Sequence, residues 1–167
     1  CFMIELIVLD VDGTLTDGKI TYLNNGEETK SFDVRDGLAI AVWTKSFGKK
    51  AAIITGRNSS IVEKRAKELN ITYLYQGIKN KQEILEEILK KEGLSWSQVA
   101  AIGDDLNDYN MLKKVGLSFT PSNGTHYLKD FVHVVCKNKG GEGAVREMLE
   151  YIFKEDGLEE DFLNAWL

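Results

Sequence analysis

Short apolar runs alternate with amphipathic segments along most of this chain. The runs are rich in β-forming residues and too short for helices, so we interpret them as buried strands. They lie at residues 6–9, 51–54, 72–75, 99–102, 117–119 and 132–136. The intervening segments repeat apolar residues with helical spacing, which predicts helices at about 36–47, 59–69, 84–89, 109–114 and 143–153.

This alternation is typical of an α/β fold with a mostly parallel sheet, helices on both faces and right-handed crossovers. At about residues 18–34, β-forming residues flank Asn24-Asn25-Gly26, which predicts a β-hairpin inserted after the first strand. The 167 residues contain one proline, no linker-like stretch and no repeat, so we expect a single domain over 1–167. The apolar C-terminal tail, about 157–167, is expected to dock either on its own domain or at a neighbour's site.

Composition narrows the classes of partner. With 21 Lys and Arg against 26 Asp and Glu, the net charge is −5, which argues against nucleic-acid binding because such binding needs a basic face. No apolar run approaches the length of a membrane span, and no basic region precedes an apolar one at the start, so neither membrane insertion nor export is expected. The two cysteines, Cys1 and Cys136, form no disulfide framework, which fits a reducing cytoplasm.

Polar side chains follow three of the predicted strands. They are Asp10 and Asp12, Thr55, and Asp104 and Asp105. Ligands of such folds bind beyond the carboxyl ends of the strands, where these groups would meet. Neighbouring carboxylates tolerate one another best with a cation between them, and a cluster of oxygen ligands suits Mg²⁺. The pattern therefore predicts a magnesium and phosphate site.

A phosphoryl group also needs hydrogen-bond donors and positive charge. Thr55 offers a hydroxyl and Gly56 a backbone amide, while Lys79 and Lys81 are the candidates for the charge, supplied from a nearby loop. Two further acids, Asp105 and Asp108, have an equal structural interpretation, because acids at the start of a helix stabilise its dipole.

The ordered strings DVDGT at 10–14, TGR at 55–57, Lys81 and GDDLND at 103–108 resemble the four motifs of the haloacid dehalogenase superfamily of phosphohydrolases. The resemblance covers nearly the whole chain and implies a Rossmann-like core. The strings TDG at 16–18, FDVRDG at 32–37, LYQG at 74–77 and GGEGAVRE at 140–147 are similar to the 3-deoxy-D-manno-octulosonate 8-phosphate phosphatases of lipopolysaccharide synthesis.

This resemblance implies a role for each matching residue. Asp10 would be the nucleophile that forms an aspartyl phosphate, and Asp12 the general acid and then base. Mg²⁺ would bind the carboxylates of Asp10 and Asp104 and the backbone carbonyl of Asp12. The phosphoryl oxygens would be bound by Thr55 and Lys81. Asp105 and Asp108 would orient the metal shell or Lys81.

The intervals between the motifs are too short for the large cap domain of many superfamily members, so the chain resembles the capless subclass. The octulosonate phosphatases that the chain resembles close their site by forming a homotetramer with hairpins at the centre. This implies that Ile20, Tyr22, Leu23 and Phe32 are interface residues, with packing on their own domain as the alternative.

Specificity for a small phosphorylated sugar acid points to arginines, which pair with carboxylates through two hydrogen bonds. Arg57 resembles the octulosonate branch, whereas Arg35 and Arg65 are equally interpretable as surface helix residues. Arg146 either caps a helix or serves the substrate. One departure from the family is the stretch 122–125, where the family has an Ala-Asp-Ala-like sequence, so the sequence does not predict the contacts of this loop. We interpret His126, which follows it, as a structural loop residue.

The same residues allow three other functions. A signalling receiver domain is disfavoured because its acceptor aspartate lies on a middle strand, whereas Asp10 follows the first. A non-catalytic oligomeric module is disfavoured by the intact motif set. A phosphatase of a nine-carbon keto-acid phosphate or another small sugar phosphate keeps the chemistry and is the main rival.

Overall fold

The sheet expected from the alternating pattern forms the centre of the computed structural model, which describes residues 3–167. Its six strands are all parallel, in the order β5-β4-β1-β6-β7-β8. In chain order they are β1 (Leu6–Leu9), β4 (Lys50–Ile54), β5 (Tyr73–Tyr75), β6 (Val99–Ile102), β7 (Leu117–Thr120) and β8 (Val134–Val135). Because β1 lies between β4 and β6, the strand order reverses at its two sides. Cys1 lies outside the described residues.

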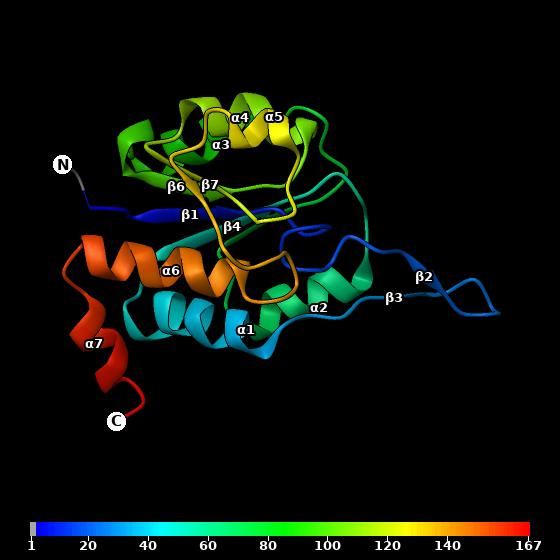
Figure 1. The fold of residues 1–167 in the computed structure, drawn as a ribbon, viewed down its shortest axis with the longest axis horizontal. Coiled ribbons are helices and arrows are strands. Elements are labelled where there is room, and N and C mark those ends of the chain that lie inside the picture. Colours follow the sequence, from blue (N-terminus) through cyan, green and yellow to red (C-terminus); the bar gives the residue numbers. More distant parts are fainter. Residues whose placement is uncertain (1–2) are drawn as a thin grey trace.

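Helices cover both faces of this sheet (Figure 1). One face packs against α1 (Val34–Ala41), its π-helical continuation (Val42–Ser46), α2 (Ser60–Glu68) and α6 (Ala144–Glu155). The last helix, α7 (Glu159–Asn164), packs on α6. The other face packs against α3 (Lys81–Glu92), α4 (Tyr109–Lys114) and α5 (His126–Lys129). Short 3₁₀ turns at Trp96–Gln98 and Leu106–Asp108 flank β6. The α/β architecture with no large cap confirms the predicted fold class.

The alternation of side chains along β1 divides the core into two layers. Ile7 and Leu9 face the layer of α1 and α6, whereas Leu6 and Val8 face the layer of α3 and α4. All four are fully buried, since a central parallel strand has helices on both sides. Within residues 3–167 no helix combines the length and the apolar character needed to span a membrane.

The predicted hairpin is formed by β2 (Thr21–Tyr22) and β3 (Glu28–Thr29), which pair antiparallel. It extends away from the sheet and its helices (Figure 1). Gly26 has a φ of 88°, which suits a tight turn because glycine has no Cβ. Ile20, Tyr22 and Leu23 are exposed, whereas Phe32 is partly buried against the core of its own chain.

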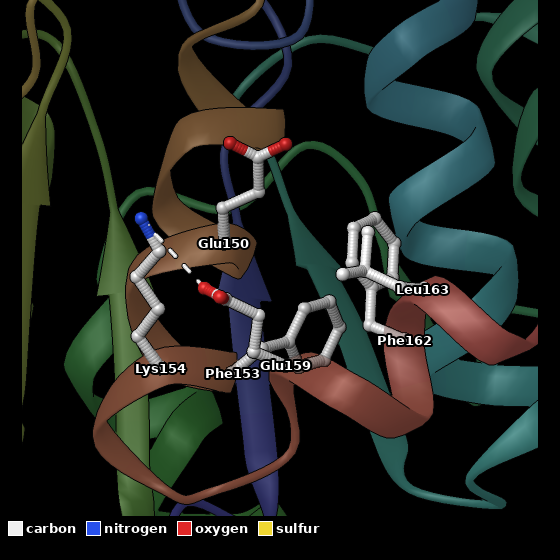
Figure 2. Close-up of a pocket in the computed structure, with 6 residues that line it drawn as sticks. All are labelled: Glu150, Phe153, Lys154, Glu159, Phe162 and Leu163. Carbon is white, nitrogen blue, oxygen red and sulfur yellow. Dashed lines mark ion pairs between the residues drawn. The ribbon is translucent and has the colours of Figure 1, made fainter.

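Two short helices depart from the sequence interpretation. His126 begins α5 and is therefore a helical residue, although it had been assigned to a loop. The tail contains α7, in which Phe162 stacks on Phe153 of α6 with ring centroids 4.8 Å apart. Phe162 therefore packs on its own domain, whereas Leu163, Trp166 and Leu167 of the tail are exposed. Figure 2 shows the cavity of about 190 Å³ that remains between α6 and α7. Its one cation, Lys154, is paired with Glu159 of the same cavity wall.

Candidate active site

The carboxyl ends of β1, β4 and β6 meet at a pocket of about 190 Å³ where the strand order reverses. The residues that line it are Asp10, Asp12, Thr55, Gly56, Arg57, Asp104, Asp105 and Asn107. All but Asn107 had been chosen from the sequence. Asn107 lies within the predicted GDDLND string and faces Gly56, so its position in that string was the available signal.

Lys81 is a buried cation that contacts this pocket through Asp10. It is the first residue of α3, whose N-terminus is capped by the side chain of Asn80. Its Nζ donates hydrogen bonds to Asp10 Oδ1 at 2.8 Å and to Asp108 Oδ1 at 2.6 Å, and its side chain is 1% exposed. Lys79, the other candidate, is exposed. The geometry therefore selects Lys81, and places it in a helix rather than in the expected loop.

Asp108 braces the loop after β6. Its Oδ2 accepts hydrogen bonds from the backbone amides of Asp104 and Asp105 at 3.0 and 3.3 Å. A Cβ at Gly103 would overlap the Asp108 side chain, so glycine allows this close approach. One oxygen of Asp108 thus holds Lys81, and the other holds the backbone of Asp104 and Asp105.

Three carboxylates approach one another closely enough to hold a cation. Oxygens of Asp10, Asp104 and Asp108 lie within 4.8 Å of one another. Burial raises the pKa of Asp10 to about 7, against the opposing charge of Lys81, and Asp104 raises it further. Burial also raises the pKa of Asp104 to about 6, as do the charges of Asp108 and Asp105, against a lowering hydrogen bond from Asp10. A divalent cation with oxygen preference relieves this repulsion, so the residues present fit Mg²⁺.

Burial shifts the pKa of Lys81 downward, whereas it shifts the pKa values of Asp10 and Asp108 upward. It lowers the pKa of the ammonium, but the negative charges of Asp10 and Asp108 outweigh it and leave the pKa above its usual range. Lys81 therefore stays positively charged at neutral pH. A fixed positive charge at this position is of the kind that phosphoryl oxygens require.

The hairpin contributes two side chains that the sequence analysis missed. Lys30 Nζ donates a hydrogen bond to Asp12 Oδ1 at 2.6 Å, and Glu28 pairs with Arg57. Glu28 and Lys30, two positions apart around β3, each contact a residue that lines the pocket. This spacing around β3 was the one available signal.

The structure does not bring the other two arginines into this pocket. Arg35 pairs with Asp33 at 3.0 Å. Arg65 lies over the ring of Phe32, 5.4 Å from its centroid. Of the three arginines predicted to meet the substrate, only Arg57 lines the pocket formed by residues 3–167.

The chain is similar to known phosphatases over most of its length. Residues 74–149 match the haloacid dehalogenase-like hydrolase family. The chain is 43% identical to the 3-deoxy-D-manno-octulosonate 8-phosphate phosphatase KdsC of Escherichia coli K12, over 92% of this chain and 81% of that protein. The chain belongs to the 3-deoxy-D-manno-octulosonate 8-phosphate phosphatase family.

Solved structures of the family have the same fold. The phosphatase from Yersinia pestis superposes with a TM-score of 0.91 at 42% identity, covering 94% of this chain and 84% of that one. The phosphatase from Moraxella catarrhalis superposes with a TM-score of 0.94 at 40% identity, covering 98% and 94%. That structure contains a magnesium ion, a phosphate ion and a KDO molecule. Family membership therefore confirms the predicted resemblance.

Proposed function

We propose that this chain is a Mg²⁺-dependent phosphomonoesterase that hydrolyses 3-deoxy-D-manno-octulosonate 8-phosphate to the free sugar acid and phosphate. The observation that carries the proposal is the convergence of Asp10, Asp12, Thr55, Lys81 and Asp104 around one pocket. It is supported by 43% identity to an enzyme of that name and by the KDO molecule in the Moraxella catarrhalis structure.

Asp10 is the nucleophile in this proposal. Lys81 occupies Asp10 Oδ1, which leaves Oδ2 to attack phosphorus and form the aspartyl phosphate. Asp12 gives a proton to the departing sugar oxygen and later takes one from the attacking water. Thr55 and the amide of Gly56, at the end of β4, bind phosphoryl oxygens together with Lys81.

The metal would be held by the carboxylates of Asp10 and Asp104 and by the backbone carbonyl of Asp12. When bound, Mg²⁺ neutralises negative charge on the nucleophile and the phosphate. In this proposal Asp108 and Asp105 position the metal ligands without binding the metal themselves. Asp108 does so by fixing the loop of Asp104, and Asp105 by capping the following 3₁₀ turn through Leu106 N.

We further propose that the enzyme is a homotetramer in which hairpins meet. The exposed side chains of Ile20, Tyr22 and Leu23 on the projecting hairpin support this, because an isolated two-stranded ribbon with apolar side chains gains stability by association. Assembly also offers a route by which Arg35 or Arg65 reaches substrate in a neighbour's pocket. A multi-angle light-scattering mass of four chains is the expected result.

The activity is tested by phosphate release across a panel of phosphate esters, including the eight-carbon and nine-carbon keto-acid phosphates. We expect strong preference for the eight-carbon ester, loss of activity in EDTA and recovery with Mg²⁺. Asp10→Asn serves as the blank, because it removes the nucleophile and nearly preserves shape. Preference for the nine-carbon ester would move the substrate to the rival class. No Mg²⁺-dependent release from any ester would refute the phosphatase.

A further inference from the structure

The hairpin brings a lysine to the carboxylate that transfers protons. Lys30 directly follows β3, and its Nζ donates a hydrogen bond to Asp12 Oδ1 at 2.6 Å. The Lys30 side chain is only 3% exposed, whereas that of Asp12 is 23% exposed. The lysine is therefore almost fully shielded from solvent, whereas part of the carboxylate stays accessible. The residues between the two form the hairpin, which closes back on the loop that carries the reacting groups.

Such a position is unfavourable for a lysine unless its partner compensates. Burial removes water from the ammonium and restricts a side chain with four rotatable bonds. Lys19, at the start of the same hairpin, stays exposed and carries no such restriction. Across residues 3–167, the hydrogen bond from Lys30 is the one that fixes the Asp12 carboxylate. Its orientation therefore depends on this single contact.

A second contact holds the hairpin independently of Lys30. Glu28, two residues earlier on the same strand face, pairs with Arg57 after β4. Glu28 also lies 3.9 Å from Lys30 Nζ. Because Arg57 is a second partner of Glu28, we expect the hairpin to keep this attachment when Lys30 is replaced. A substitution at Lys30 thus tests the orientation of Asp12 rather than the attachment of the hairpin.

We propose that Lys30 is a positioning residue for the proton transfers of Asp12, a role that rests on the proposed phosphatase function. Lys30 holds Oδ1, so that Oδ2 carries the proton. When the bond between phosphorus and the sugar oxygen breaks, its electron pair stays on the sugar oxygen, which takes the proton from Oδ2. In the second step Oδ2 takes a proton from water while the water oxygen bonds to phosphorus and the bond from phosphorus to Asp10 breaks.

The test uses leaving groups that differ in their need for a proton. We would measure kcat/KM, which reports the step that releases the leaving group, for aryl phosphates of increasing phenol pKa and for a simple alkyl phosphate. In Lys30→Met we expect a loss of about 10–100-fold on the alkyl phosphate and of less than about 3-fold on the most acidic phenol. Lys30→Arg keeps a charged donor and is expected to recover part of the loss. Lys19→Met is the matched control and should follow the wild-type line.

The outcomes separate this proposal from the function on which it rests. A steeper dependence of log kcat/KM on leaving-group pKa in Lys30→Met than in Lys19→Met supports positioning of the acid. Equal slopes of log kcat/KM against leaving-group pKa for the two variants would overturn the proposal. A loss confined to the sugar-acid phosphate would also overturn it, because Lys30 would then be a substrate contact. If Lys30→Met does not fold, Lys30→Gln, which also removes the charge but keeps a polar side chain, takes its place in this comparison. Inactivity of the wild-type enzyme on every ester would instead refute the phosphatase.

Discussion

Replacing Lys81 by methionine removes the cation between two buried carboxylates while keeping most of the side-chain volume. Lys81 Nζ lies 2.8 Å from Asp10 and 2.6 Å from Asp108. The exposed fractions of the two acid side chains are 5% and 0%, so water cannot replace the lost partner. We expect Lys81→Met to lower both the stability and the activity of the protein.

The size of the stability loss follows from these contacts. Two unit charges at this separation attract by about 6 kcal/mol at an effective dielectric constant of about 20. Desolvation of all three charges offsets much of that attraction, and removal of one partner of a buried pair typically costs about 3–5 kcal/mol. For a chain of this size that corresponds to a fall in Tm of roughly 6–20 °C.

The loss should depend on pH in one direction. Burial already raises the pKa of Asp10 to about 7 and that of Asp108 to about 6, and removal of the ammonium raises both further. A carboxyl group whose pKa is higher in the folded state binds more protons when folded. Stability of the variant is therefore regained as pH falls from 8 through these values toward the unfolded value near 4.

Thermal unfolding at pH 8 and pH 5, in EDTA, measures both effects. Lys79→Met is the matched control, because Lys79 lies two residues earlier and is exposed. We expect Lys79→Met to stay within about 0.5 kcal/mol of wild type at both pH values. Equal losses in the two variants at pH 8, or a loss at Lys81 that does not shrink at pH 5, would refute the assignment of Lys81 as the charge that compensates the two acids.

Three other substitutions test two further features of the structure. Gly13 and Gly26 have φ values of 89° and 88°, but a Cβ at Gly13 would overlap Asp104 whereas Gly26 has open space around it. Both alanine variants should lose about 1–3 kcal/mol of stability from backbone strain. Only Gly13→Ala should also lose Mg²⁺-dependent phosphate release. Retained activity in Gly13→Ala would contradict the predicted overlap between its Cβ and Asp104. Buried Asp36 accepts a hydrogen bond from Arg146 N at the start of α6, and burial raises its pKa to about 6. Asp36→Asn keeps an acceptor and removes the charge, so calorimetry at pH 8 should show a gain of up to about 3 kcal/mol that shrinks toward pH 4. A gain independent of pH would show that the charge is not its source.

The central strands and the residues after them could be predicted because their signals are local. The apolar runs of β1 and β6 identify buried strands, and parallel pairing forces their carboxyl ends together. Asp10 and Asp104 are placed by that rule alone. The choice between Lys79 and Lys81 depends instead on where α3 begins. Asn80 as N-cap determines that start, and a capping signal of this kind is readable in sequence.

Contacts made by the hairpin could not be predicted in the same way. The approach of Lys30 to Asp12 depends on the path of the ribbon relative to the sheet, which local patterns do not encode. The helix of the tail is a different case. Glu159, Glu160 and Asp161 form an acidic first turn, which is a helix-start signal that the sequence analysis did not use.

The central position of β1 also affects how the chain folds during synthesis. β1 is made first, yet its partners β4 and β6 follow about 40 and 90 residues later. At about 5–20 residues per second, the second partner emerges from the ribosome about 5–20 s after β1. During that interval Leu6–Leu9 has no completed sheet to enter, so this fully apolar stretch stays exposed to aggregation until β4 and β6 have been made.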